Sequence, residues 1–153
     1  MTNSIKIVDM ERKHLKKVYD IDTYYFSTII EKLSFVLALL FRKIFTAFRV
    51  ALIGEKIVGS CSIINLRDGC HINNISVDPQ HRNQGIGQKL LVDIMDIAKS
   101  KGNKTLFLEV RKSNLSAQTL YKKYGFVEYG LKENYYPLKT KGKEDAILMK
   151  KTL

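Results

Sequence analysis

The sequence predicts an α/β fold in which helices flank a mixed, mostly antiparallel central sheet. Two observations predict it. Runs of β-forming residues alternate with turn residues between residues 50 and 77, as in an antiparallel meander, and helical and strand patterns alternate between residues 86 and 149. A length of 153 residues fits one domain, so we expect a single domain over residues 1–153.

The first half of the chain supplies a short strand, a charged helix and the meander. A strand is expected at residues 5–8, followed by a helix that carries Leu15 and Val18. Residues 29–45 are apolar on nearly all sides, which is typical of a helix that is buried or faces a partner. The strands of the meander are expected at residues 50–53, 57–64 and 71–77, with turns at residues 54–56 and 67–69.

The second half alternates helices with strands. Apolar residues recur at helical spacing from Gly87 to Ala98, and Gly102 is a natural end for that helix. A second helix, over residues 117–124, has Ser113 or Asn114 as its N-terminal cap. Strands are expected at residues 105–110, 126–129 and 146–149.

The chain is strongly basic, because 26 Lys and Arg side chains against 15 Asp and Glu give a formal net charge of +11. Such a surface attracts nucleic acids, anionic membranes or acidic small molecules. The lysines occur in short groups, so the plainest interpretation is a solvated basic surface. No apolar run reaches the ~20 residues of a membrane-spanning helix, and the first residues show no secretory signal, so we expect a cytoplasmic protein.

The cysteines and histidines do not form a metal-binding pattern. Cys61, Cys70, His71 and His81 lack zinc spacing, and Cys70 and His71 are expected on opposite faces of one strand. Two cysteines in a chain of 153 residues do not make a disulfide scaffold. We therefore expect no metal ion and no thiol nucleophile.

The most specific chemistry lies in the loop between the strand that ends at Val77 and the helix that follows. A glycine-containing loop that opens a helix presents free backbone N–H groups, which bind phosphates. Gly85 and Gly87 let a ligand approach the backbone without a Cβ in the way. The dinucleotide-binding fingerprint is excluded because Leu90 stands where it requires a third glycine, and Gly54-Glu55-Lys56 is not a P-loop.

The loop Arg82-Asn83-Gln84-Gly85-Ile86-Gly87 resembles the coenzyme A pyrophosphate loop of the GCN5-related N-acetyltransferase (GNAT) superfamily. The strand before it, Ile72-Asn73-Asn74-Ile75-Ser76-Val77-Asp78-Pro79, resembles the central strand of that family. Motifs from Leu108-Glu109-Val110-Arg111 to Asn134-Tyr135-Tyr136-Pro137 and Met149 resemble the branch that acetylates protein N-termini, the ribosomal-protein-alanine and archaeal N-terminal acetyltransferases. The resemblance covers about residues 50–150.

The resemblance implies a GNAT-like fold in which a splayed strand pair holds acetyl-CoA. Glu109 resembles the family's general base and Tyr121 its general acid, while Tyr135 and Tyr136 match the loop that covers an incoming peptide N-terminus. Each residue also has a plainer alternative role. Glu109 would be a charged strand end, Tyr121 would pack in the core, and Tyr135 and Tyr136 would pack against the final hairpin. For Asn114, which resembles a residue that binds the coenzyme arm, the alternative is a helix cap. The residues implied to bind the coenzyme are Ile75, Ser76, Val77, Arg82, Asn83, Gln84, Gly85, Ile86, Gly87, Gln88, Asn114 and Tyr121.

The implied function is transfer of an acetyl group to the N-terminal α-amine of proteins, by direct attack and without a covalent intermediate. An α-amine titrates near 7.7–8.0 and a lysine near 10.4, so an N-terminus already has a useful neutral fraction near neutral pH. Two alternatives stay open: acetylation of lysines or small-molecule amines on the same fold, and a basic module that binds nucleic acid or the ribosome.

The N-terminal third departs from the family pattern. The N-terminal branch often carries a proline-containing loop between its first two helices, which residues 23–26 lack, and Glu31 is the nearest counterpart of a second carboxylate found in some archaeal relatives. The apolar segment at residues 29–45 fits a homodimer face or an interfacial helix. The basic surface fits a position close to the ribosome as well as the phosphates of coenzyme A.

Overall fold

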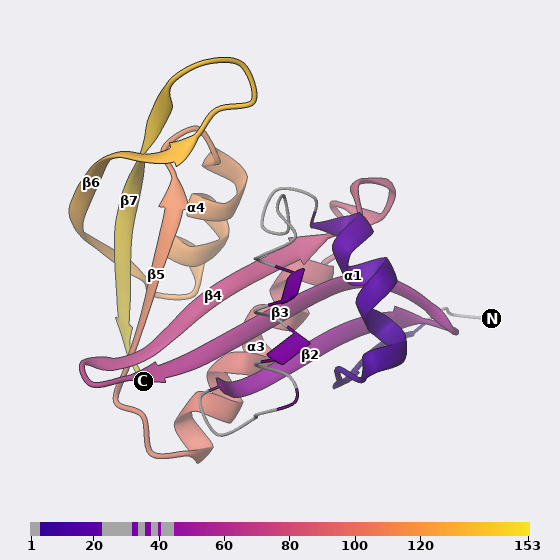
Figure 1. Ribbon diagram of the computed structural model, residues 1–153. Helices are drawn as coiled ribbons and strands as arrows, with labels where there is room; N and C mark the ends of the chain where they lie inside the picture. Colours follow the sequence, from indigo (N-terminus) through magenta and orange to yellow (C-terminus); the bar gives the residue numbers. More distant parts are fainter. Residues whose placement is uncertain (1–3, 23–31, 34–35, 38–39, 41–44) are drawn as a thin grey trace.

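The computed structural model describes residues 4–22, 32–33, 36–37, 40 and 45–153 (Figure 1). In this part of the chain seven strands form one sheet in the order β1-β2-β3-β4-β5-β7-β6. Neighbouring strands are antiparallel except β4 and β5, which are parallel, so the predicted mixed, mostly antiparallel sheet is confirmed. The strands are β1 (Ile5–Asp9), β2 (Phe45–Ile53), β3 (Lys56–Leu66), β4 (Gly69–Val77), β5 (Thr105–Arg111), β6 (Val127–Pro137) and β7 (Lys143–Thr152).

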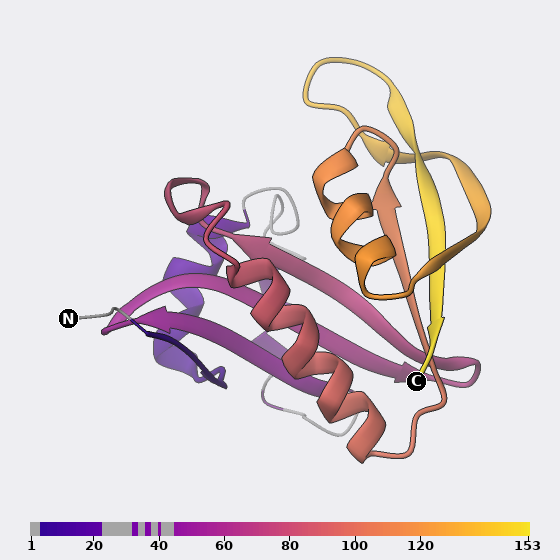
Figure 2. The ribbon, with the colours of Figure 1, turned by 180° about the vertical axis from the view of Figure 1, so that it is seen from behind.

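Helices cover both faces of the sheet. α1 (Leu15–Ile21) lies on one face, and α3 (Ile86–Ser100) and α4 (Leu115–Lys123) lie on the other, which Figure 2 shows from behind. Short 3-10 turns, Arg12–His14 and Pro79–His81, precede α1 and α3. Because α3 packs along β2, β3 and β4, the loop that opens α3 is held against the end of β4.

The main hydrophobic core lies between α3 and the sheet. β3 lies between β2 and β4 in the sheet, and it is buried continuously from Ile57 to Ile63. A second apolar cluster, which includes Val18 and Phe48, lies under α1 on the opposite face. Burying one such side chain contributes about 1.5–3 kcal/mol, so both helical layers hold the sheet in place. The buried side chains of α3 follow helical spacing and are Ile86, Leu90, Leu91, Ile94 and Ala98.

The parallel strands β4 and β5 separate soon after they begin side by side. Their pairing joins Cys70–Ile72 only to Leu106–Leu108. Beyond it, residues 74–77 of β4 pair with β3, and residues 109–111 of β5 pair with β7. Figures 1 and 2 both show the two strands diverging. The predicted splayed strand pair is confirmed, and among the described residues each strand has one backbone edge without a neighbouring strand beyond the split.

Several predicted strand boundaries are wrong. β2 begins at Phe45 and not at residue 50, because its first residues pair with residues 61–64 of β3, a long-range contact that local sequence does not reveal. β6 and β7 are also longer than predicted, since they extend each other as one hairpin from residue 127 to residue 152.

The apolar segment at residues 29–45 is only partly described. Lys32, Leu33, Val36, Leu37 and Leu40 are helical, in agreement with the prediction, but the helix cannot extend to residue 45, where β2 begins. Leu33, Leu37 and Leu40 are 46–59% exposed, so these three residues are not buried within the chain, and a helix that faces a partner stays a prediction. Glu31 and residues 23–26 lie outside the described residues.

Further observations on helices, thiols and metal-binding groups apply only to the described residues. None of their helices is long and apolar enough to cross a membrane. Cys61 and Cys70 are buried thiols, and burial raises the pKa of the Cys61 thiol far above its ordinary value, which leaves it unreactive. No group of three His, Cys, Asp or Glu side chains in the described ranges is arranged to hold a metal ion.

Candidate active site

The loop from Asp78 to Gly85 joins the diverging end of β4 to α3. Asp78 is buried, and its carboxylate accepts a hydrogen bond from the Gln80 amide at 3.0 Å and pairs with Lys17 of α1 at 3.3 Å. These contacts hold the pKa of Asp78 below its ordinary value, and the hydrogen bond from the backbone amide of Gln80 contributes most. Asn83 and Gly85 adopt φ angles of 60° and 76°, a left-handed conformation that these residue types tolerate.

The first turn of α3 presents backbone amides to the end of this loop. Gly85 is the N-cap residue of α3, and no side chain among the described residues caps the helix. The first helical hydrogen bond runs from Lys89 N–H to Gly85 O at 3.0 Å. The amides of Ile86, Gly87 and Gln88 therefore precede the helical ladder. A Cβ at Gly85 would meet nothing within 4 Å, so the loop is open at this point. The arrangement fits a phosphate group.

The exposed members of the predicted loop are Arg82, Asn83, Gln84, Gly85 and Gln88. The Ile86 side chain is 1% exposed and packs in the core, so this residue can face a ligand only through its backbone. The structure thus brings the predicted loop residues together at one helix end, with the basic side chain on the solvent side.

The other predicted coenzyme residues lie on β4 and at the start of α4. Ile75, Ser76 and Val77 lie on the part of β4 that has left β5, with β3 on their other edge. Asn114 caps α4, since its Oδ1 accepts a hydrogen bond from Ala117 N–H at 3.1 Å. The capping role of Asn114 is confirmed, while its contact with a coenzyme stays a prediction.

Glu109 lies on β5 directly after the last residue that pairs with β4. Its carboxylate is partly exposed, and Oε1 accepts a hydrogen bond from Lys132 Nζ at 2.7 Å. Its carbonyl oxygen accepts a hydrogen bond from Tyr136 Oη at 3.1 Å. The hydrogen bond to Glu109 raises the pKa of Lys132, so the ammonium keeps its charge at neutral pH. A carboxylate in this position can accept a proton from an amine beside the strand split.

Tyr121 lies on α4, on the opposite face of the sheet from α1. Its side chain is 8% exposed, and its ring packs against Phe126 at a centroid distance of 5.7 Å. Core packing, the plainer alternative, is therefore confirmed. Burial raises the pKa of Tyr121 well above its ordinary value, so the phenol keeps its proton at neutral pH. A buried phenol of this kind can also donate that proton.

Tyr135 and Tyr136 approach Glu109 from the end of β6. The two rings meet edge to face at 4.9 Å, and Tyr135 is 45% exposed while Tyr136 is largely buried. The Arg111 guanidinium lies 4.6 Å from the centre of the Tyr136 ring and pairs with Glu144 of β7. The pKa of Tyr136 is raised, mainly by burial and secondly by the charge of Glu109. Tyr136 is therefore held by contacts with Glu109 and Arg111 of β5, and Tyr135 is exposed.

The structure adds residues that the sequence analysis did not select. Lys132 contacts Glu109 although β7 lies between their strands. Gln118 Nε2 of α4 donates to the carbonyl oxygens of Arg111 (3.1 Å) and Lys112 (3.0 Å) at the end of β5. No sequence signal could have found the contact of Lys132, because it depends on sheet order and on bulges in β6. The contacts of Gln118 are local, since its acceptors precede it by seven and six residues.

Comparisons with known proteins give a consistent result. The family model described as "Acetyltransferase (GNAT) family" matches residues 15–126. The [ribosomal protein bS18]-alanine N-acetyltransferase of Escherichia coli (strain K12) is 46% identical over 82 residues, 54% of this chain and 55% of the relative, so that match spans about half of the relative's length. A Bacillus subtilis (strain 168) relative whose name refers to the same activity is 33% identical over 149 residues, 97% of this chain and 96% of its own.

Solved structures agree with these matches. The crystal structure of the ribosomal-protein-S18-alanine N-acetyltransferase from Escherichia coli has a TM-score of 0.84 and 30% identity, and it covers 97% of this chain and 94% of its own. A GNAT family acetyltransferase from Elizabethkingia anophelis with acetyl-CoA bound shares the fold, with a TM-score of 0.76, 24% identity and 100% of both chains covered. The family model, the relative matched over nearly its whole length and the splayed sheet together establish that this chain belongs to the acetyltransferase (GNAT) family.

Proposed function

We propose that the protein is an acetyl-CoA-dependent N-acetyltransferase that acetylates the N-terminal α-amine of a protein. The observation that carries this proposal is the position of Glu109, which is the first residue of β5 beyond its pairing with β4. There it lies under the Tyr135–Tyr136 end of β6, and the buried Tyr121 comes from a helix tied to the same strand. We take the domain to be residues 1–153.

The coenzyme would lie along the strand split and the opening turn of α3. Acetyl-CoA supplies the acetyl group as a thioester when it is bound. The amides of Ile86, Gly87 and Gln88, with the exposed Arg82, would bind the pyrophosphate. The free backbone edge of Ile75–Val77 would pair with the arm of the coenzyme.

Glu109 would act as the general base. A protein α-amine has a pKa near 7.7–8.0, so only a small driving force is needed to remove its proton, and a positioned carboxylate can take it directly or through one water. The side chain is partly exposed and contacts Lys132, whose ammonium also lies over the Tyr135 ring, on the side where a peptide would approach.

Tyr121 would act as the general acid. Its raised pKa keeps the hydroxyl protonated, so it can give its proton to the leaving sulfur. The proton that Tyr121 donates is then replaced from solvent, and the proton taken by Glu109 is released, so the two groups return to their starting states. No covalent bond to the protein is needed.

The substrate proposal follows from the Tyr135–Tyr136 end of β6 and from the names of the relatives. A partly exposed pair of tyrosines suits contact with a peptide backbone. The Escherichia coli relative is named for the alanine of ribosomal protein bS18. We therefore propose a protein N-terminus, with a ribosomal protein as the first candidate.

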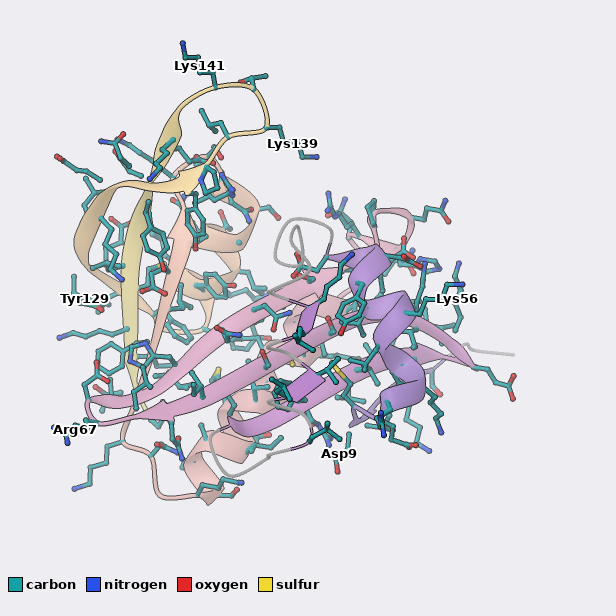
Figure 3. The ribbon with its side chains drawn as sticks, viewed as in Figure 1. Asp9, Lys56, Arg67, Tyr129, Lys139 and Lys141 are labelled. Atoms are coloured by element: carbon teal, nitrogen blue, oxygen red, sulfur yellow. The ribbon has the colours of Figure 1, made fainter. Side chains whose placement is uncertain are left out.

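The basic surface supports a position close to the ribosome. Figure 3 shows Lys139 and Lys141 projecting outward from the turn between β6 and β7, away from the body of the sheet. Flexible cations on a turn suit contact with a polyanion such as ribosomal RNA. A ribosome pull-down that weakens with salt and with Lys139→Glu plus Lys141→Glu supports this role, whereas equal retention of the double variant contradicts it. The predicted homodimer stays a prediction.

The proposed function is tested with a peptide mixture, acetyl-CoA and mass spectrometry. The peptides vary in their first two residues, contain internal lysines, and are paired with copies whose N-termini are blocked. Acetylation only of free N-termini supports the proposal and identifies the preferred sequence. Acetylation of the blocked copies assigns the protein to lysine side chains instead. Binding of coenzyme without acetylation of any peptide favours a small-molecule amine.

A further inference from the structure

Lys132 reaches across a whole strand to contact Glu109. The strands that carry them, β6 and β5, are separated by β7, so the two backbones lie two strand spacings apart, roughly 10 Å. Lys132 Nζ nevertheless donates to Glu109 Oε1 at 2.7 Å. The register of β6 shifts on both sides of Lys132, between Glu128 and Gly130 and between Lys132 and Tyr136. Such bulges redirect side chains, here toward the candidate site.

The contact is poorly explained as a stabilising feature. The Lys132 side chain is 44% exposed and that of Glu109 is 26% exposed, and ion pairs with this exposure contribute little to folding. The Lys132 ammonium also lies 4.8 Å from the centre of the Tyr135 ring. It is therefore held between two residues of the candidate active site, where its charge acts on anything that approaches Glu109.

We propose that Lys132 is a positioning and specificity-determining residue, whose ammonium holds the Glu109 carboxylate toward the amine site and disfavours amines that arrive protonated. This proposal rests on the proposed function, with Glu109 as the base. It deepens that function by giving a physical reason for the choice of α-amines over lysine side chains.

The selectivity follows from the charge of the incoming amine. A lysine side chain, with a pKa near 10.4, arrives almost entirely as a cation, whereas an N-terminus has a substantial neutral fraction near pH 7.5. A cation that approaches Glu109 must displace Lys132 and is repelled by it, but a neutral amine is not. The pKa of Lys132 is raised by its hydrogen bond to Glu109, so the ammonium persists throughout the range in which substrates titrate.

Other charged groups near Glu109 do not duplicate this role in the described structure. Tyr129, Tyr135 and Tyr136 of β6 carry phenol groups, which are not cations in any protonation state. Arg111, two residues along β5, pairs with Glu144 of β7 and stacks over Tyr136. On the β4 side, the residues that follow the split, Asn73 and Asn74, do not titrate. Among the described residues, Lys132 is thus the cation that contacts the Glu109 carboxylate directly.

The test is a competition assay with Lys132→Met, which keeps the length of the side chain and removes its charge. One tube contains a peptide with a free N-terminus and no lysine, and a peptide with a blocked N-terminus and one lysine. Mass spectrometry gives the ratio of their kcat/KM values between pH 6 and pH 9.5. Lys132→Arg keeps the cation, and Lys150→Met removes a cation that lies over the Tyr129 ring at 5.4 Å, outside the pair.

In Lys132→Met, the ratio of kcat/KM for the free N-terminus to kcat/KM for the lysine should fall about fivefold. A partly exposed ion pair contributes an effect of about this size. The acidic limb of the α-amine pH profile should also move to higher pH, because loss of an opposite charge raises a carboxylate's pKa. Lys132→Arg and Lys150→Met should keep the wild-type ratio and profile. Lys132→Gln replaces Lys132→Met if the latter is not folded.

The outcomes separate the two proposals. If wild-type protein acetylates free N-termini but Lys132→Met keeps the wild-type ratio and pH profile, the role of Lys132 is overturned and the proposed function stands. If Lys132→Met loses activity on both peptides equally, with an unchanged profile, Lys132 is only structural. If wild-type protein acetylates no free N-terminus, the proposed function fails and the role of Lys132 falls with it.

Discussion

Gln118 ties the helix that carries Tyr121 to the strand that carries Glu109. Its side-chain amide donates to the carbonyl oxygen of Arg111 at 3.1 Å and also to that of Lys112 at 3.0 Å, where β5 has left its parallel neighbour. Gln118 precedes Tyr121 by one helical turn on α4 and is buried. The relative position of the proposed acid and base is therefore fixed by a side chain that need not touch either.

Gln118→Ala should lower both stability and turnover. The substitution removes two partly buried hydrogen bonds, each worth about 0.5–1.5 kcal/mol. The Arg111 carbonyl oxygen still accepts a hydrogen bond from the backbone N–H of Asn114. Urea unfolding measures that loss, and kcat should fall more than coenzyme affinity because Tyr121 is no longer held. Gln80→Ala, which removes an exposed side chain, is the matched control. Equal unfolding free energies for the two variants would contradict this account.

Glu109→Gln should lower kcat about 100-fold, the usual contribution of a positioned general base. The amide keeps the size of the side chain and can still accept a hydrogen bond from Lys132, so folding and coenzyme affinity should stay near wild type. Steady-state kinetics and coenzyme titration measure the two effects. Glu133→Gln, on the exposed part of β6, controls for loss of a nearby negative charge. Full turnover in Glu109→Gln would remove it as the base.

Tyr121→Phe should lower kcat about 100-fold while the fold is kept, because the ring still packs against Phe126. Burial raises the pKa of Tyr121 above its ordinary value near 10, so the hydroxyl stays protonated throughout the assay range. The wild-type rate should therefore show no loss from Tyr121 ionisation up to pH 9.5. A basic limb below pH 9 that disappears in Tyr121→Phe would contradict this assignment of the raised pKa.

Gly85→Ala should destabilise the protein through its backbone. A Cβ at Gly85 has open space around it, but the φ angle of 76° costs an L-residue about 1–2 kcal/mol. Since the same residue shapes the opening of α3, coenzyme affinity should fall as well. For a chain of this size, thermal unfolding should shift by about 2–4 °C per kcal/mol.

Gly87→Ala provides the comparison for stability. Its Cβ would meet Leu120 and Val77 at 3.7 Å, which is ordinary van der Waals contact, and its backbone is not left-handed. The unfolding temperature of Gly87→Ala should therefore stay at or above that of the wild type, since alanine favours a helix over glycine. A larger loss of unfolding temperature in Gly87→Ala than in Gly85→Ala would mean that side-chain packing, and not backbone geometry, determines the stability of the loop.

The hairpin that carries Tyr135 and Tyr136 should loosen in acid. The Asn134 N–H donates to Asp145 Oδ1 at 3.1 Å and Lys112 pairs with Asp145 Oδ2 at 3.2 Å, and both contacts lower the pKa of Asp145. A carboxyl group whose pKa is lowered by folding stabilises the fold above its unfolded pKa, and that contribution is lost as the pH falls through the folded value.

An NMR titration of the Asn134 amide measures this change. Its midpoint should lie below the ordinary aspartate value of about 3.9. Asp145→Asn should abolish the titration, because the amide does not ionise in this range. A midpoint at or above the ordinary value would show that the two contacts do not favour the ionised form.

The sequence was sufficient for features that depend on local pattern. The helical spacing of Leu90, Leu91 and Ile94 predicted the buried face of α3, and the loop before it predicted an anion-binding helix end. The predicted Asn114 cap is present because capping involves only the next three residues. The likeness of the loop and of the β5–α4 region to one family was confirmed by the family match and by the splayed sheet.

Features that depend on register were not predictable. The start of β2 at Phe45 follows from its pairing with β3, and the contact between Lys132 and Glu109 requires both the order β5-β7-β6 and two irregularities in β6. A bulge changes which side chains share a face without leaving a clear mark in a single sequence. Exposure of Leu33 and Leu37 likewise depends on what packs beside their helix, which hydrophobicity alone does not determine.

The most direct test of the central claim follows one peptide that carries a free N-terminus and one internal lysine. It is incubated with acetyl-CoA and the protein, and fragmentation mass spectrometry locates the added acetyl group. The account predicts acetylation of the α-amine, and a rate about 100-fold lower with Glu109→Gln. Acetylation of the lysine alone, or an equal rate with Glu109→Gln, would contradict it.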